Sequence, residues 1–185
     1  MKNIATGALL GVLVAMTGCQ SMDGMHDGDG MHMMKAKMSD AQILSVLHTA
    51  NMGEISQGQI ALQKAQRADV RNFAQRMVSE HTDNDQKGKA LLTSANMAPQ
   101  NNHLSMKLQK DSDDVVMKLN KADAKDFDKT YMESQVKVHK MVLETIDKKL
   151  IPNAQHPDLR NHLTMTRAAV AMHLQMAEQL SDSLK

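Results

Sequence analysis

The sequence has few of the residues that stabilise a fold through covalent or aromatic contacts. Cys19 is the only cysteine, so the chain cannot form an internal disulfide. Aromatic residues make up 2% of the chain and tryptophan is absent, while methionine occurs 18 times, so the core must be aliphatic and adaptable. Only three prolines interrupt 185 residues, which favours helices. Length and composition fit one globular domain preceded by shorter segments.

The chain also lacks an excess of charge of either sign. It has 22 lysine and arginine residues against 21 acidic residues, for a formal net charge of +1. Nucleic-acid binding depends on clustered basic residues, and no such cluster is visible. We therefore expect no nucleic-acid partner.

Residues 1–18 have the pattern of a secretion signal, with a basic residue at Lys2, a short apolar run and small residues before Cys19. The tetrapeptide MTGC, at 16–19, is similar to the lipobox of bacterial lipoprotein signals, although its first residue is usually leucine. This resemblance implies cleavage before Cys19 and a membrane anchor formed by lipid on that cysteine. Gln20 in the next position implies the outer membrane, with the domain facing the periplasm. The alternative is an ordinary cleaved signal with an incidental cysteine.

Residues 19–38 are rich in glycine, aspartate, methionine and histidine and have no apolar periodicity, which predicts a flexible tether. The tetrapeptide DGMH occurs twice within it. Thioethers and imidazoles are ligands that suit copper, so the tether is a candidate metal-binding segment. The candidate ligands are Met25, His26, Met31, His32, Met33 and Met34. A solvated spacer that binds nothing is the alternative interpretation.

Apolar residues at helical spacing predict four long helices in the remaining domain, residues 39–185. The predicted ranges are about 39–67, 69–95, 123–150 and 157–184. The first begins at a Ser39-Asp40 cap, the third ends before Pro152, and the fourth opens with Pro157. The segment between the second and third helices is too long for a tight turn and contains a short helical pattern. We therefore predict an all-α four-helix bundle, in which two antiparallel hairpins are joined by a long crossover containing a short helix.

Each predicted long helix carries a polar residue on or beside its apolar seam near the middle of its length, and His139 is slightly off its seam. These residues are Glu54, His81, His139 and His173. The first two should lie level in an antiparallel pair, whereas the last two differ by about one turn. Asp85, one turn beyond His81, is a further candidate ligand.

Inward-facing glutamate and histidine residues on facing helices are how bundle cores bind metal ions. The seam residues could therefore form a mononuclear site for copper, zinc or iron, and its nitrogen-rich ligand set favours the first two. The alternative is a neutral polar network with buried water, which would satisfy the same groups and fix the helix register.

Three segments around the seam histidines carry a resemblance to a known family: FAQRMVSEHTDND at 73–85, FDKTYMESQVKVHKMVLE at 127–144 and HLQMAEQL at 173–180. They resemble the domain of unknown function 4142, which is found in bacterial secreted and predicted outer-membrane proteins. The resemblance covers about residues 39–182 and implies a ferritin-like four-helix bundle, but it implies no reaction.

These patterns favour a non-enzymatic, lipid-anchored envelope protein that binds a metal ion. A structural or stress-related envelope module without metal is the second hypothesis. A peroxide- or oxygen-reactive metalloenzyme is disfavoured, because none of the three seam histidines has a glutamate three positions before it, as di-iron bundle enzymes do.

Overall fold

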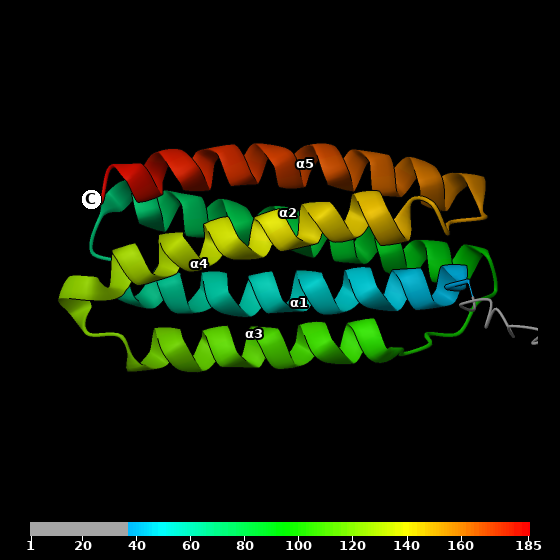
Figure 1. The fold of residues 1–185 in the computed structure, drawn as a ribbon, viewed down its shortest axis with the longest axis horizontal. Helices are drawn as coiled ribbons and strands as arrows, with labels where there is room; N and C mark the ends of the chain where they lie inside the picture. Colours follow the sequence, from blue (N-terminus) through cyan, green and yellow to red (C-terminus); the bar gives the residue numbers. More distant parts are fainter. Residues whose placement is uncertain (1–36) are drawn as a thin grey trace, which may run out of the picture. The chain divides into compact units, whose positions relative to one another are not determined.

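Five α-helices make up most of residues 37–185, the part of the chain that the computed structural model describes (Figure 1). The signal peptide, the candidate lipid attachment residue Cys19 and the tether ligands predicted from the sequence lie outside these residues. No strand occurs within them, which confirms the predicted all-α class. The elements are α1 (Asp40–Lys64), α2 (Ala68–Ser94), α3 (His103–Lys121), α4 (Ala124–Thr145), a π-helical turn (Ile146–Leu150) and α5 (Pro157–Asp182).

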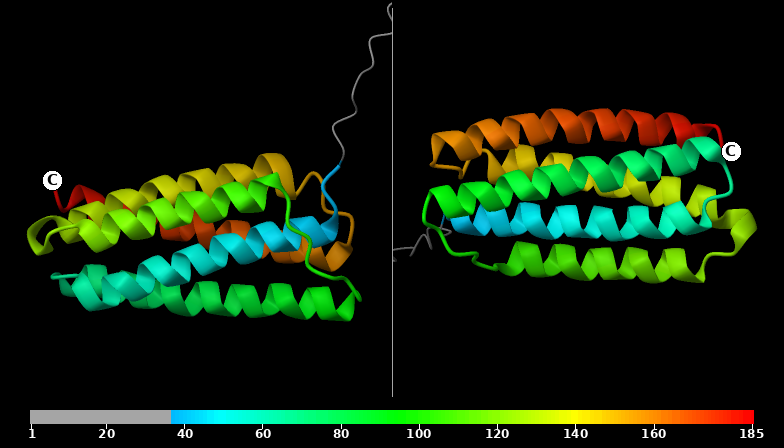
Figure 2. Two further views of the ribbon diagram at one scale, coloured as in Figure 1. Left: turned by 90° about the horizontal axis from the view of Figure 1, so that it is seen from below. Right: turned by 180° about the vertical axis from the view of Figure 1, so that it is seen from behind.

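The helices form two antiparallel hairpins joined by a crossover. The first hairpin is α1 with α2, the second is α4 with α5, and α3 runs beside α1 between them (Figures 1 and 2). The crossover helix is longer than the sequence pattern indicated, because α3 extends over 19 residues. Only Ser105, Leu108 and Leu119 of α3 are buried, so this helix lies on the bundle rather than inside it.

The helix ends follow local sequence signals. Ser39 caps α1 by accepting a hydrogen bond from the Gln42 backbone at 3.2 Å, and the Gln42 side chain accepts one from Ser39 in return. Pro157 occupies the first turn of α5, where its missing N–H is not needed. At the end of α4, the Ile151 N–H bonds the carbonyl of Ile146 at 3.0 Å, which closes the π-helical turn.

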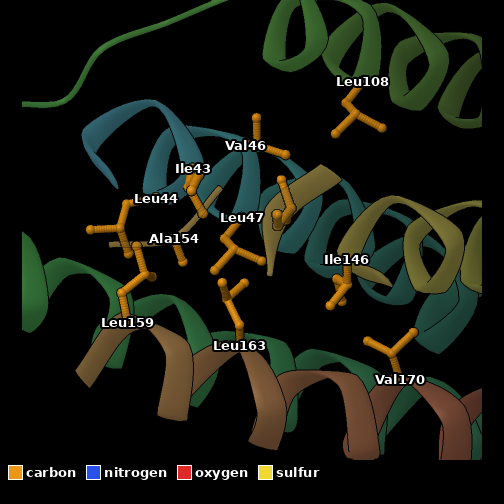
Figure 3. Close-up of a cluster of buried hydrophobic side chains, with 11 residues drawn as sticks. Ile43, Leu44, Val46, Leu47, Leu108, Ile146, Ala154, Leu159, Leu163 and Val170 are labelled. Atoms are coloured by element: carbon orange, nitrogen blue, oxygen red, sulfur yellow. The ribbon is translucent and has the colours of Figure 1, made fainter. Parts of the chain in front are cut away.

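Two apolar clusters hold the helices together, one toward each end of the bundle, and a polar layer separates them. The first cluster comprises Ile43, Leu44, Val46, Leu47, Leu108, Ile146, Leu150, Ala154, Leu159, Leu163 and Val170 (Figure 3). The second comprises Ala61, Ala65, Val70, Phe73, Ala74, Met77, Leu119, Phe127, Tyr131, Met132 and Ala177. The four seam residues predicted from the sequence lie between the two clusters along their helices. Within the described residues, no helix is both long and apolar enough to cross a bilayer.

Candidate metal centre

Three histidine side chains from three helices converge in the polar layer. His81 of α2, His139 of α4 and His173 of α5 each offer one ring nitrogen, and these atoms all lie within 4.8 Å of one another. Their ring centroids are 5.3, 5.4 and 5.9 Å apart, so the rings form a nearly equilateral group. The side chains are 7%, 1% and 2% exposed, respectively. The expected one-turn offset between His139 and His173 therefore does not keep their rings apart.

A backbone carbonyl determines which ring nitrogen of His139 carries a hydrogen. Its Nδ1 lies 2.9 Å from the carbonyl oxygen of Gln135, one turn earlier in α4. A carbonyl oxygen can only accept, so Nδ1 must carry the hydrogen. In the neutral ring the lone pair is then on Nε2.

A series of hydrogen-bonded side-chain amides determines the tautomer of His81 in the same way. The Nδ1 of His81 lies 2.9 Å from Oδ1 of Asn51. The amide nitrogen of Asn51 donates to Asn84 at 2.9 Å, and the Asn84 amide donates to Thr166 at 2.7 Å. Because this series orients Asn51 with its oxygen toward the imidazole, the His81 Nδ1 donates and its Nε2 carries the lone pair.

A carboxylate determines the tautomer of His173. Its Nε2 lies 2.6 Å from Glu80 of α2, and the other carboxylate oxygen of Glu80 accepts from Arg76 at 2.6 Å. Partial burial raises the pKa of Glu80, but hydrogen bonds from Arg76 and His173 outweigh it and bring the pKa below its ordinary value. The ionised Glu80 therefore accepts the Nε2 hydrogen, and the lone pair of His173 is on Nδ1.

The three nitrogens that carry lone pairs have no hydrogen-bond partner among the described residues, and all three are buried. An unsatisfied buried acceptor costs about 1–3 kcal/mol. Burial, followed by the neighbouring His139 and His173, lowers the pKa of His81 well below its ordinary value. Burial also lowers the pKa of His173. Neutral imidazoles with their outer N–H groups held by acceptors are in the state required of metal ligands, so these residues fit a bound metal ion.

Glu54, the fourth seam residue, lies beside this group but not in it. Its Oε1 is 3.9 Å from His139 Nδ1, the nitrogen already bonded to the Gln135 carbonyl. Both carboxyl oxygens lack a partner among the described residues, and burial raises the pKa of Glu54. The convergent group thus consists of three nitrogens, an arrangement that leaves a tetrahedral metal with one open position.

Asp85, the further candidate ligand, faces away from the three histidines. Its two carboxylate oxygens contact His48 Nδ1 at 2.6 Å and Lys89 Nζ at 2.7 Å. Both Asp85 oxygens are thus engaged by other side chains, and Asp85 is not among the residues whose ligand atoms converge. The six tether candidates lie outside the described residues, so only the three seam histidines are brought together.

The residues that orient the imidazoles were not predicted from the sequence. Asn51 lies on the apolar seam of α1, and a polar residue on a seam was the available signal. The acceptor for His139 is a backbone carbonyl, which no residue type marks in the sequence. Glu80 gave no such signal, because it is adjacent to His81 and its partner is on α5. Only the packing of α2 against α5 identifies it.

A family model described as Domain of unknown function (DUF4142) matches residues 29–180, which include nearly all of the helical bundle. The chain belongs to this family. Comparison with curated proteins and with solved structures gave no match. The DUF4142 description names no reaction or ligand, so the chemistry of this chain has to be argued from its own residues.

Proposed function

We propose that the protein binds one copper or zinc ion through His81, His139 and His173. The observation that supports this most strongly is that these histidines, from three helices, each bring a ring nitrogen within 4.8 Å of the others. Each also has a buried ring nitrogen with no hydrogen-bond partner among the described residues. Neutral imidazole suits both metals, and a set of three nitrogens without a carboxylate favours them over iron. A structural polar layer would instead satisfy these nitrogens with buried water, and the metal titration distinguishes the two.

The metal site would belong to a lipid-anchored protein of the bacterial cell envelope. The lipobox-like segment ending at Cys19 supports the anchor, and Gln20 supports an outer-membrane protein that faces the periplasm. The repeated DGMH sequence supports a second, looser copper site in the tether. Together these features favour metal binding or handling in the envelope over catalysis.

The test is a titration of the metal-free chain without its signal, using zinc and copper, with stoichiometry and melting temperature recorded. We expect one ion per chain to raise the melting temperature, because an ion that binds only the folded state stabilises it. A variant with His26→Ala and His32→Ala removes the tether histidines, so an ion bound by the bundle should be kept in it.

The decisive variant combines His81→Gln with His173→Gln, and it should lose the stabilising ion. The matched control combines His103→Gln with His162→Gln, which removes two histidines outside the cluster, and it should still bind. If the cluster variant keeps the stoichiometry and affinity of the parent, the proposed site is wrong.

A further inference from the structure

A hollow of about 360 Å³ lies between α1, α3 and α4, next to the polar layer but separate from the three histidines. Its walls are largely apolar and include Leu108 and Val115 of α3 and Val138, Met141 and Val142 of α4. The volume lies within the range of small-molecule pockets, and an apolar lining with few polar groups is typical of them. The crossover helix α3 thus covers a cavity instead of packing closely along its whole length.

The inner end of this cavity holds the buried carboxyl group of Glu54. Glu54 lines the cavity, is 2% exposed, and neither of its oxygens has a hydrogen-bond partner among the described residues. Its polar neighbours are the side-chain amide of Gln135, which donates to Gln57 at 3.0 Å, and His139 Nδ1, which is 3.9 Å away and bonded to a backbone carbonyl. Leaving such a group unsatisfied is unfavourable, and a polar group that reached it through the cavity would remove that penalty.

The outer edge of the cavity carries unbalanced positive charge. Lys107 pairs with Asp111 at 2.5 Å, and Asp114 pairs with Lys110 at 2.7 Å. The acidic residues of the edge are therefore already paired. Lys118 and Lys137 also line the cavity, are exposed, and form no ion pair with any described residue. These two lysines favour an anion at the mouth.

We propose that this cavity binds a small amphipathic organic anion. Its acidic group lies between Lys118 and Lys137, its apolar body contacts the α3 and α4 side chains, and a hydroxyl at its far end hydrogen-bonds Glu54. None of the three histidines lines this cavity, so ligand binding there does not depend on whether they bind a metal. The proposed class of ligand is a small molecule with an aliphatic body, an acidic group at one end and a hydroxyl at the other.

The probe is omega-hydroxydecanoate, titrated by calorimetry into the metal-free chain below its micelle concentration. Decanoate, which lacks the hydroxyl, and decylammonium, which has the opposite charge, are the comparison ligands. We expect one saturable site per chain, about tenfold weaker binding of decanoate, and no saturable binding of decylammonium. Absence of saturable binding by omega-hydroxydecanoate, or equal binding of the cation, would overturn the proposal.

Two pairs of variants locate the site. Lys118→Glu with Lys137→Glu should weaken omega-hydroxydecanoate by about tenfold or more, while Lys125→Glu with Lys149→Glu, at exposed positions away from the cavity, should not. Val115→Phe should fill the cavity and block binding, whereas Met117→Phe, on the exposed face of α3, should leave it unchanged. Equal effects of the cavity variants and their controls would place the ligand elsewhere and refute the assignment.

Glu54→Leu tests the inner contact separately. It removes the hydrogen-bonding group, so the variant should bind omega-hydroxydecanoate no better than decanoate. If the preference for the hydroxyl persists in this variant, Glu54 is not its partner and the proposed orientation is wrong. Melting temperatures of all variants show that each remains folded.

Discussion

The three histidines are each oriented by a different kind of acceptor, and the difference determines how each can be disturbed. His139 depends on a backbone carbonyl, which no side-chain substitution removes, whereas His81 depends on the Asn51 amide and His173 on the Glu80 carboxylate. An outer acceptor holds the ring in place and makes the inner nitrogen a better ligand. Glu80 is the most informative of these positions, because it is partly exposed and can change without disturbing the core.

We expect Glu80→Gln to weaken zinc binding by about tenfold or more, because an amide is a poorer acceptor than a carboxylate for the His173 N–H. Glu178→Gln is the matched control, since the one ion pair of Glu178 among the described residues is with the exposed Lys140. The measurement is zinc affinity by competition with a chelator. Equal affinities for the two variants would show that Glu80 does not act through His173.

His173→Leu separates metal binding from folding. In the metal-free protein it removes an unpartnered buried nitrogen and also one hydrogen bond to Glu80, so we expect the free energy of unfolding in urea to change by less than about 1 kcal/mol. Zinc should no longer raise the melting temperature. A loss above about 2 kcal/mol would instead show that the imidazole is needed by the metal-free fold.

The control for that experiment is His162→Leu. His162 is also buried and also has an unpartnered Nε2, but it is not one of the three convergent histidines. Zinc should still stabilise this variant. If both leucine variants lose the response to zinc, the effect does not come from the cluster.

Glu54→Gln should stabilise the metal-free protein increasingly as the pH rises. Burial raises the pKa of Glu54 above its ordinary value of 4.5, so above that value the unfolded chain loses its proton more readily than the folded protein. Ionisation therefore favours unfolding at neutral pH, and glutamine removes that effect. Urea melts at about pH 5 and about pH 7.5 test this, with exposed Glu133→Gln as control. An advantage that does not change with pH would contradict the direction of the shift.

At the scale of the helices, the sequence predicted the features that depend on residues close together in the chain, such as helix starts and inward-facing positions. The Ser39 cap, the start of α5 at Pro157 and the inward direction of His81 and His173 follow from capping chemistry and helical period. The length of α3 was underestimated because its apolar positions are sparse. The pairing of Glu80 with His173 was not predictable either, because it depends on how α2 and α5 are rotated relative to each other.

Close helix contact gives a prediction that distinguishes two glycines. A Cβ at Gly58 of α1 would lie 2.8 Å from Val78 and 3.2 Å from the Ala74 carbonyl of α2, whereas at Gly88 the nearest atom is 3.7 Å away. We expect Gly58→Ala to destabilise the protein by about 1–2 kcal/mol, because overpacking exceeds the gain in helix propensity. Gly88→Ala should stabilise it by about 0.5–1 kcal/mol. Equal changes in the free energy of unfolding for the two variants, measured by urea melts, would contradict this packing.

At the scale of the whole bundle, the candidate metal centre joins the two hairpins. His81 belongs to the first hairpin, while His139 and His173 belong to the second. The two apolar clusters supply packing toward the ends, and the layer between them consists of polar groups that are only partly satisfied. A metal ion in that layer would link the hairpins at mid-length. Its binding free energy would then stabilise the whole fold.

The measurement that tests this account most directly is X-ray absorption spectroscopy of the zinc-loaded chain in which His26 and His32 are replaced by alanine. We predict three imidazole nitrogens at about 2.0–2.1 Å from zinc, with one further light atom in the open position. An equivalent sample that also carries His81→Gln and His173→Gln should lose the scattering from imidazole ligands. A zinc ion surrounded only by oxygen or sulfur atoms, or one with unchanged imidazole scattering in the cluster variant, would contradict a three-histidine metal centre.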